Sequence, residues 1–575
     1  MGAGGGTRAR RFVALGVVTA LGIGAVGATA ASGATAKVGP EVKGVGIGSK
    51  EALAQETCDQ ATERTNFVGV GTGPLCVNPW PEGEDNGGAT APGVTADSVK
   101  VVVYYGNEQM AAAERAAGGR LPVNRVTGEP GTWPDNFREF AEVMQYAVDT
   151  YGTYQTWGRE PVFEFVEATG DDEAAQRADA VTVAAMKPFI VIDASNQNKG
   201  APVFESEMAK AKIIVNGAGA SSLTPEQLAS QAPYRWATQS DSTASVYLVS
   251  NFVARSLAKR PAQFAGDDEL KEKTRVFGIV TPEGVLDVDL FNSLTKKDGG
   301  TVPVVSATYD PNADPSAIDT VAKSFVAQMK SQGVTSIILF AANTPTGSIT
   351  RAATENDYHP EWIVTGYQFS DFDGFARAYD QEQFANAFGL GVLNPRAKED
   401  PAVPAPLESF NWYWGETNGT YAATTVGWMS FIYGAMQYAG PQLTAKNVQR
   451  GLFSVPAAGG ASDGTVSFQT GYGRTVGLPY DEYLGLGTDM TMIWWNPDLQ
   501  TDGTNAVANF PGKGRFMYLN DGKRYSFGQF PKQEPKFFDA SASIYEFPQE
   551  LAFATGEVPA PNPCTGCPSQ GGSSP

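Results

Sequence analysis

The sequence predicts an α/β protein with two doubly wound parallel-sheet lobes. Short runs of apolar and β-branched residues alternate with helical patterns over roughly 300 residues in the middle of the chain. Repeated strand–helix–strand order implies right-handed crossovers, parallel sheets and helices on both faces. Because this many elements exceed one comfortable sheet, we expect two lobes rather than one.

The individual elements follow in chain order. Residues 99–105 are a nearly continuous β-branched run, which is typical of a strand that is buried on both faces. Apolar residues from 137 to 151 recur at helical spacing, and Asp135 is the expected N-cap of that helix. Further strands are predicted at 162–166, 189–192, 212–215, 276–280 and 336–340, and helices at 173–186, 318–329 and 421–439.

Composition narrows the functional classes. The chain of 575 residues has 42 basic and 62 acidic side chains, a net charge of −20, which argues against a nucleic-acid partner. Its single histidine, His359, excludes sites that require two or more histidines, such as HExxH zinc sites. No cofactor is expected.

The first 36 residues predict an export signal. Three arginines between residues 8 and 11 precede an apolar stretch at 12–28, and 34–36 has the A-x-A form of a cleavage site, with 28–30 as the alternative. An uncleaved membrane anchor is the competing interpretation. We expect a protein at the cell surface, in the periplasm or outside the cell.

Four cysteines agree with an exported chain. Cys58 and Cys76 lie close in sequence, as do Cys564 and Cys567, so pairing within each pair is the simplest of the three possible connectivities. A zinc or redox role for Cys564 and Cys567 is the alternative, but the surrounding tail is rich in Pro, Ser and Gly and holds no second CxxC.

Small polar residues follow several predicted strands. Ligands of doubly wound sheets bind beyond the carboxyl ends of the strands. The segments 193–198, 216–222, 341–344 and 365–368 carry hydroxyl, amide and backbone donors, which suit a polar or anionic small molecule. Ordinary helix capping is the alternative for any one of these residues.

The order of the predicted elements resembles that of the type I periplasmic binding proteins, the leucine/isoleucine/valine-binding branch of ABC-transporter solute receptors. The resemblance covers about 93–500 and is carried by six sequence segments that are similar to successive segments of that family: 93–101, 214–221, 234–238, 334–340, 362–367 and 388–392. It implies two lobes with a hinge and an interlobe cleft, and a monomer that passes its ligand to a membrane permease.

The resemblance also implies ligand-binding residues. Tyr105 is expected to form an apolar wall of the ligand site, and the segment after residue 364 is expected to contact the ligand from the second lobe. The expected set is Tyr105, Ser195, Asn196, Gln197, Ala218, Ala220, Ser221, Ser222, Asn343, Thr344, Tyr367 and Gln368. Family members that bind amino acids place an acidic residue after the strand that ends near Val364, where this chain has Tyr367 and Gln368. That departure counts against an α-amino acid ligand.

Composition predicts a signal at 1–36, a Gly-rich extension with Cys58–Cys76 at 37–96 and a flexible tail at 553–575. The resemblance implies a first lobe at 97–240 and about 392–470, and a second lobe at 241–391 and about 471–545. The function expected is solute capture by hinge closure for an ABC permease, with an amino acid or other polar metabolite as ligand. The alternatives are a ligand-sensing module of a surface receptor and an exported α/β hydrolase. The sequence contains one G-x-S-x-G match, at residues 460–464, but no strand is predicted before it as a nucleophile elbow requires, so we do not expect an enzyme.

Overall fold

The structure is a computed structural model. It describes residues 45–547 except for 61–62, 66–72, 82, 117–121, 123, 125–126, 128, 197–199, 219–222, 224, 238–241, 285, 311–312, 394–395, 398–412, 415–421, 467, 474–487 and 502–511. The predicted export signal, the predicted Cys564–Cys567 pair and the predicted tail lie outside the described residues.

The first sheet contains five parallel strands in the order β4-β3-β5-β6-β7. Numbered within the sheet this is 2-1-3-4-5, a doubly wound order. Val102 and Val191 pack with α4 and α5 on one face, whereas Val101 and Ile192 pack with α3 and α15 on the other. The elements are β3 (Ser98–Tyr105), α2 (Glu108–Ala116), α3 (Trp133–Tyr151), β4 (Glu160–Glu167), α4 (Glu173–Ala185), β5 (Ile190–Ala194), α5 (Pro202–Lys210), β6 (Ile214–Gly217), α6 (Pro225–Ser230), β7 (Arg235–Ala237), α15 (Ala422–Ala439) and α16 (Ala445–Ser454).

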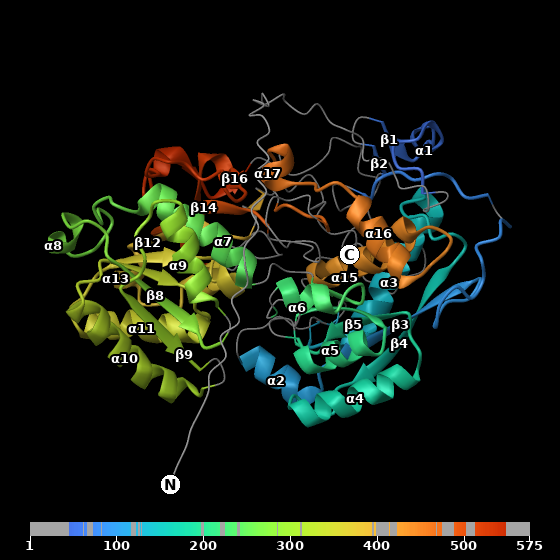
Figure 1. Ribbon diagram of the computed structural model, residues 1–575, viewed down its shortest axis with the longest axis horizontal. Coiled ribbons are helices and arrows are strands. Elements are labelled where there is room, and N and C mark those ends of the chain that lie inside the picture. The colour runs from blue at the N-terminus through green and yellow to red at the C-terminus, as the bar shows by residue number, and fades with distance from the viewer. Residues whose placement is uncertain are drawn as a thin grey trace, which may run out of the picture. The chain divides into compact units, whose positions relative to one another are not determined.

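The second sheet repeats the same order. Strands β9-β8-β10-β11-β12 are parallel and again read 2-1-3-4-5, and β14, β15 and β17 extend the sheet antiparallel to their neighbours. Figure 1 shows α10 and α11 below this sheet and α7 and α9 above it. The elements are α7 (Ser242–Phe252), η2 (Val253–Leu257), α8 (Asp268–Lys271), β8 (Phe277–Pro282), α9 (Val288–Lys297), β9 (Val305–Tyr309), α10 (Pro315–Ser331), β10 (Ser336–Leu339), α11 (Asn343–Glu355), β11 (Glu361–Val364), η3 (Tyr367–Phe369), α12 (Asp373–Ala376), α13 (Gln381–Phe384), β12 (Ala387–Gly391), β13 (Arg396–Ala397), α17 (Gly460–Asp463), β14 (Met490–Thr501), β15 (Gly512–Leu519), η4 (Asn520–Gly522), β16 (Arg524–Tyr525), η5 (Ala540–Ala542), β17 (Ser543–Ile544) and β18 (Glu546–Phe547).

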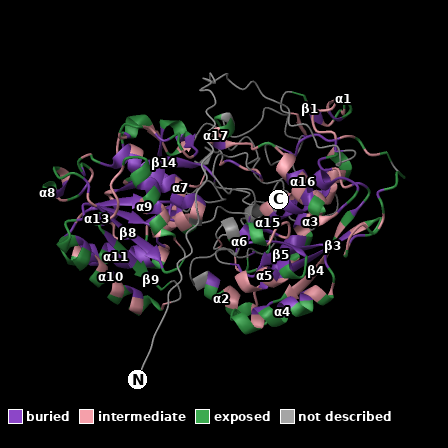
Figure 2. Ribbon diagram, in the orientation of Figure 1, coloured by how far each residue is buried: buried purple, intermediate pink, exposed green. Residues whose placement is uncertain are grey.

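Two doubly wound sheets with helices on both faces confirm the predicted α/β class. Figure 2 shows buried strands in both sheets, while the outer helices α4 and α10 carry exposed residues. This is why the strand sequences read as continuous apolar runs. The antiparallel strands β14 and β15 were not predicted, and the hinge and the cleft stay predictions.

The start of α3 corrects one expectation. The helix begins at Trp133, and its N-cap is Thr132, whose Oγ1 accepts a hydrogen bond from Asp135 N. Asp135 therefore lies inside the first turn, where its carboxylate accepts the Thr132 hydroxyl at 2.7 Å. The prediction of Asp135 as the N-cap was wrong because Pro134 is accommodated within the first turn rather than before it.

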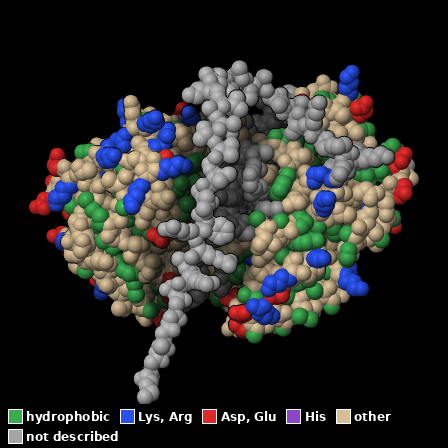
Figure 3. All heavy atoms as spheres, viewed as in Figure 1, with side chains coloured by type: hydrophobic (Ala, Val, Ile, Leu, Met, Phe, Trp, Pro, Cys, Tyr) green, Lys and Arg blue, Asp and Glu red, His purple; other side chains and the backbone are tan. Residues whose placement is uncertain are grey.

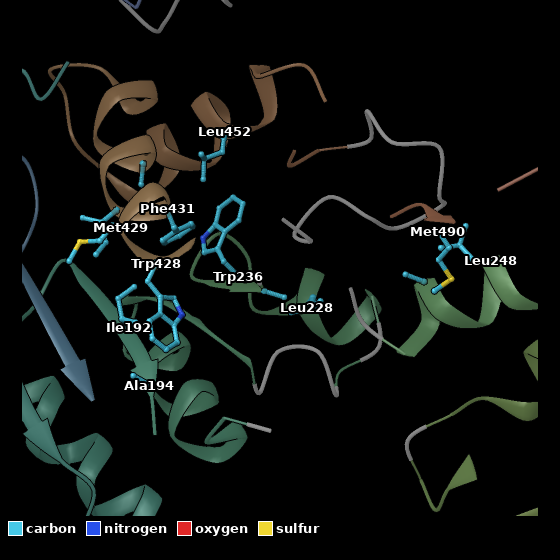
Figure 4. Close-up of a cluster of buried hydrophobic side chains, with 14 of the residues drawn as sticks. Ile192, Ala194, Leu228, Trp236, Leu248, Trp428, Met429, Phe431, Leu452 and Met490 are labelled. Carbon is cyan, nitrogen blue, oxygen red and sulfur yellow. The ribbon is translucent and has the colours of Figure 1, made fainter. Parts of the chain in front are cut away.

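The aromatic core of the first sheet lies under α15. Trp428 of this helix stacks on Phe137 of α3 with ring centroids 5.6 Å apart. Figure 4 shows Trp236 of β7 beside Phe431 and Leu452, which come from α15 and α16. The predicted reading of 421–439 as a buried helix is confirmed over its described residues, and no described helix of the chain has the length and hydropathy needed to cross a bilayer.

The Gly-rich extension is fastened to the first sheet and its helices. Arg159, only 1% exposed, donates to the backbone carbonyls of Asn86, Gly88, Thr95 and Pro441 at 2.8–3.1 Å. These carbonyls lie outside helices and strands and would otherwise be buried without a hydrogen-bond partner. The charge-assisted bonds from Arg159 supply that partner.

A disulfide closes part of the same extension. Cys58 and Cys76 are bonded, as predicted, and both are buried. Next to this bond, Leu75 N donates to the Tyr438 hydroxyl at 2.9 Å, and Gln437 Nε2 donates to Leu75 O at 2.9 Å. The cross-linked segment is thereby tied to α15. The short elements here are α1 (Lys50–Leu53), β1 (Cys58–Asp59) and β2 (Arg64–Thr65).

Candidate solute-binding edges

The carboxyl edge of the first sheet collects several of the predicted residues. Tyr105 pairs in register with Ala194, and Asp193 pairs with Gly217, so the segments that follow β3, β5 and β6 leave the sheet side by side. Tyr105 and Asn196 are half-buried at this edge, and Ala218 is buried. The order reverses between β3 and β5, which is the point where doubly wound sheets bind ligands.

Ser195 is engaged inside the sheet edge. Its hydroxyl donates to Asp193 Oδ1 at 2.6 Å, its backbone N–H donates to the same oxygen at 3.0 Å, and the residue is 2% exposed. The proton of this hydroxyl is therefore committed to Asp193. Ser195 can act on a ligand only as an acceptor or by shaping the turn.

A buried ionic network supports this edge from below. Arg235 donates to Glu205 Oε2 through Nε at 2.9 Å and Nη2 at 2.7 Å, and both side chains are fully buried. Burial raises the pKa of Glu205 to about 8, with the Asp193 carboxylate adding to the rise and Arg235 opposing it. The sequence did not indicate this network, because its members are far apart in the chain and each lies in an ordinary helix or strand.

Gly217 is required for the close approach of these groups. A Cβ at this position would lie 2.7 Å from Asp193 Cβ and would also collide with the Glu205 carboxylate. The strand that carries the predicted ligand loop is thus packed directly against the buried carboxyl groups.

The carboxyl edge of the second sheet brings together the other predicted residues. Leu339 pairs with Val364, and Thr365 Oγ1 donates to Leu339 O at 2.7 Å, which joins the ends of β10 and β11. Asn343 begins α11 and is half-buried, and Thr344 is exposed. Tyr367 is half-buried and Gln368 is exposed just beyond β11.

Aromatic rings line this second edge. Phe340 lies 6.4 Å from Tyr367 and 6.2 Å from Phe291 between ring centroids. Tyr309 accepts the Ala342 N–H through its hydroxyl at 3.2 Å, and burial raises the pKa of Tyr309 to about 12. Burial also raises the pKa of Tyr367. Phe291, Tyr309 and Phe340 were missed as candidates; Phe340 closes a predicted strand and Phe291 packs on it, whereas Tyr309 ends β9, which was not predicted.

The acidic residues after β11, Asp371 and Asp373, are bonded to other parts of the chain rather than offered to a ligand. Asp373 is buried, accepts Phe516 N at 3.0 Å and lies 3.4 Å from Arg515 Nε. Asp371 is buried and accepts Leu393 N at 2.7 Å. Neither carboxylate is presented at the sheet edge, so the described part of this segment offers no counter-charge for an ammonium group. The remaining predicted residues, Gln197, Ala220, Ser221 and Ser222, lie outside the described residues.

No protein-family model matches the chain, and no curated protein matches it. Among solved structures the chain is similar to an ABC-transporter solute-binding protein from R. palustris in complex with 4-hydroxybenzoate, with 11% identity, 77% of this chain and 100% of that chain covered, and a TM-score of 0.43. It is also similar to a leucine-, isoleucine-, valine-, threonine- and alanine-binding protein from Brucella ovis in a closed conformation, with 11% identity, 76% and 98% covered, and a TM-score of 0.47. A third is an ABC-transporter substrate-binding protein from Desulfitobacterium hafniense, with 12% identity, 74% and 100% covered, and a TM-score of 0.45.

The names of these three structures describe solute-, substrate- or amino-acid-binding proteins. The fold of this chain is defined by its two sheets and the strand order that they share.

His359 lies away from both edges. It precedes β11 and therefore stands at the amino end of that strand, opposite to the carboxyl edge. Its Nδ1 lies 3.1 Å from Asp267 Oδ1 and its Nε2 lies 3.1 Å from Glu382 Oε1. This imidazole links two surface carboxylates, which is a structural role.

The surface charge is mixed. On the face shown in Figure 3, basic and acidic side chains of the described residues are interspersed among neutral ones. Several Lys and Arg side chains lie near one another at the upper left of this face, while the net charge of the whole chain is −20.

Proposed function

We propose that the chain is an exported solute-binding receptor that captures a small polar or amphipathic ligand between two lobes and delivers it to an ABC permease. The observation that carries the proposal is the repeated 2-1-3-4-5 order, because each sheet then has its own switch point at a carboxyl edge. The lobes are 97–240 with about 392–470, and 241–391 with about 471–545. Closure of the hinge desolvates the ligand and presents a new surface to the permease.

The two edges suit different parts of one ligand. The first edge offers backbone and small polar groups around Asn196 and Ala218, which suit a carboxylate or another polar group. The second edge offers the half-buried Tyr367, which packs on the fully buried Phe340 and suits an apolar or aromatic body. An aromatic or apolar acid fits both edges better than an α-amino acid, since the ammonium group of the latter has no carboxylate partner in the described segment after β11.

Thermal unfolding in the presence of defined solutes tests this proposal. A solute bound only by the folded state raises the melting temperature, and 100 times the dissociation constant adds about 2.7 kcal/mol of stability. We use 4-hydroxybenzoate, benzoate and L-leucine as probes because two of the similar structures carry such ligands in their names. We expect the aromatic acids to raise the melting temperature more than L-leucine, with calorimetry giving a dissociation constant near about 1 μM.

A panel of aromatic acids, branched-chain acids, amino acids and short peptides extends the same measurement. Failure of every member to shift the melting temperature would contradict a solute receptor. A sensing module would bind the same solutes but would not be retained by the permease, so co-purification from membranes separates transport from sensing.

A further inference from the structure

A strained loop follows β11 at the second carboxyl edge. Three of its residues have left-handed backbone angles: Gly366 at φ 70°, Gln368 at φ 47° and Phe369 at φ 58°. Such a conformation is natural for glycine but costs about 1–3 kcal/mol for other residues, above all for a bulky one. Strain of this kind persists only where the surroundings hold the loop, and Tyr367 within it packs against Phe340.

Asp371 joins the end of this loop to another segment of the chain. Its Oδ2 accepts the backbone N–H of Leu393, which follows β12, at 2.7 Å. Its Oδ1 is buried without a hydrogen-bond partner. A Cβ at Gly391 would lie 2.9 Å from the same carboxylate, so the chain leaving β12 passes directly over Asp371.

Arg524 holds the same segment from the other side. It donates to Val392 O at 2.9 Å and to Leu393 O at 3.3 Å, and it forms a fully buried ion pair with Asp489, Nε to Oδ1, at 2.9 Å. Arg524 also lowers the pKa of Asp371, against the stronger effect of burial. The backbone of 392–393 is therefore held by two buried charged side chains, Asp371 and Arg524, and Arg524 is in turn paired with Asp489.

Asp489 extends the connection to residues 455–473, which we name the arm. Its carboxylate accepts Ala461 N at 2.8 Å and Gln469 N at 3.0 Å. The far end of the arm packs in the first sheet's core, where Tyr472 lies 5.0 Å from Trp236 between ring centroids. The arm thus contacts Asp489 at the start of β14 and Trp236 of β7, strands that belong to different sheets.

We propose that Asp371, Arg524 and Asp489 are positioning residues that couple the strained edge loop 366–369 to the arm. This inference rests on the proposed function, in which Tyr367 of the loop contacts the solute and the two lobes close on it. A change at Tyr367 then reaches Leu393 through Asp371, and reaches the arm through Arg524 and Asp489. If these three residues had only a structural role, the loss of one bond would affect only the residues that form it.

Hydrogen exchange of backbone amides, measured on the full chain without any solute, tests the coupling. In Asp371→Ala the Leu393 amide loses its acceptor, and we expect it to exchange about tenfold faster. The amides of Ala461 and Gln469 bond to Asp489 and not to Asp371, yet we expect them to accelerate too. The amides of Ile337 and Ile338 in β10 report global unfolding and should change less.

Two variants act as controls. Asp371→Asn retains an oxygen acceptor for Leu393 N and should restore slow exchange in the arm. Asp380→Ala removes a matched carboxylate that accepts Glu382 N and Gln383 N, and it should accelerate only those amides. If Asp371→Ala does not fold, Arg524→Lys, which keeps the charge but loses the forked contacts, should accelerate Leu393, Ala461 and Gln469 together.

The coupling is refuted if Leu393 alone accelerates in Asp371→Ala, or if the arm changes only as much as β10. Since no solute is used, that outcome leaves solute binding untouched, and a failure of solute binding leaves this measurement unaffected.

Discussion

Glu205 and Arg235 form an ion pair, with Oε2 and Nη2 2.7 Å apart, in which neither side chain is exposed. The pair lies beneath the edge from which the predicted ligand loop departs, and Arg235 Nη1 also donates to Ser206 Oγ and Gln231 Oε1 at 2.8 and 3.1 Å. All three donor groups of the guanidinium are therefore used, which makes the pair a support for strand β6 and its neighbours.

Removal of one partner from this pair should be costly. Arg235→Ala leaves the Glu205 and Asp193 carboxyl groups buried together, and we expect a loss of about 3–5 kcal/mol in the free energy of unfolding, measured with urea. Lys271→Ala breaks an exposed pair with Asp268 and should change it by less than about 1 kcal/mol. Equal losses in the two variants would mean that burial does not govern the contribution of these pairs.

The stability of the protein should depend on pH through Asp371. Burial raises the pKa of Asp371 from 3.8 to about 6, with the Leu393 N–H and Arg524 opposing the rise. The folded state therefore binds more protons than the unfolded state between these values. This contribution, on the order of 3 kcal/mol, is complete below about pH 4 and is lost as pH rises through about 6.

Asp371→Asn removes that titration and keeps the side-chain volume. The free energy of unfolding of the variant relative to the original protein should increase between pH 4 and pH 7, as measured by urea unfolding at each pH. Two parallel stability curves over this range would show that Asp371 does not titrate there.

The disulfide should stabilise the extension. Cys58 and Cys76 are separated by 18 residues, and a loop of that length contributes about 3 kcal/mol in the chain-entropy account. Reduction, or Cys58→Ser with Cys76→Ser, should lower the urea midpoint and expose the segment around Leu75 to proteolysis. Cys564→Ser with Cys567→Ser is the matched control, and we expect a smaller effect from it. The prediction fails if proteolysis near Leu75 is unchanged.

The predicted ligand loop can be tested directly. Ser221→Ala with Ser222→Ala removes two hydroxyl donors, and we expect binding of the best aromatic acid from the thermal screen to weaken by about 1–3 kcal/mol in calorimetry. His359→Ala lies at the opposite end of its strand and should leave that affinity unchanged. Unaltered affinity in the serine variant would remove the loop from the proposed site.

The regular elements were largely predictable from the sequence. The strand predicted at 99–105 is observed at Ser98–Tyr105, and the helix predicted at 173–186 at Glu173–Ala185. Both succeed because burial on both sheet faces produces continuous apolar runs, while helices keep a polar face. The N-cap of α3 was misplaced because Thr132 and Asp135 are both good capping residues, and Pro134 lies within the first turn rather than before it.

Partnerships between distant residues could not be predicted. No local pattern links Asp371 to Leu393, yet the Asp371 carboxylate accepts the backbone N–H of Leu393, which is 22 residues away. The antiparallel pairing of β14 with β12, such as Trp494 with Phe388, joins segments about one hundred residues apart, and no local pattern records such a choice.

The α/β class, the division into two sheets and the buried strands were predictable from the sequence, and Cys58–Cys76 was the simplest of three pairings, because hydrophobic periodicity and cysteine spacing are local properties of the chain. The folded structure was needed to show that Ser195 donates to Asp193, that Asp371 and Arg524 both bond the backbone of 392–393, and that Arg524 pairs with Asp489. Buried charges need partners, and the chain supplies those partners from wherever the fold brings them within hydrogen-bond distance.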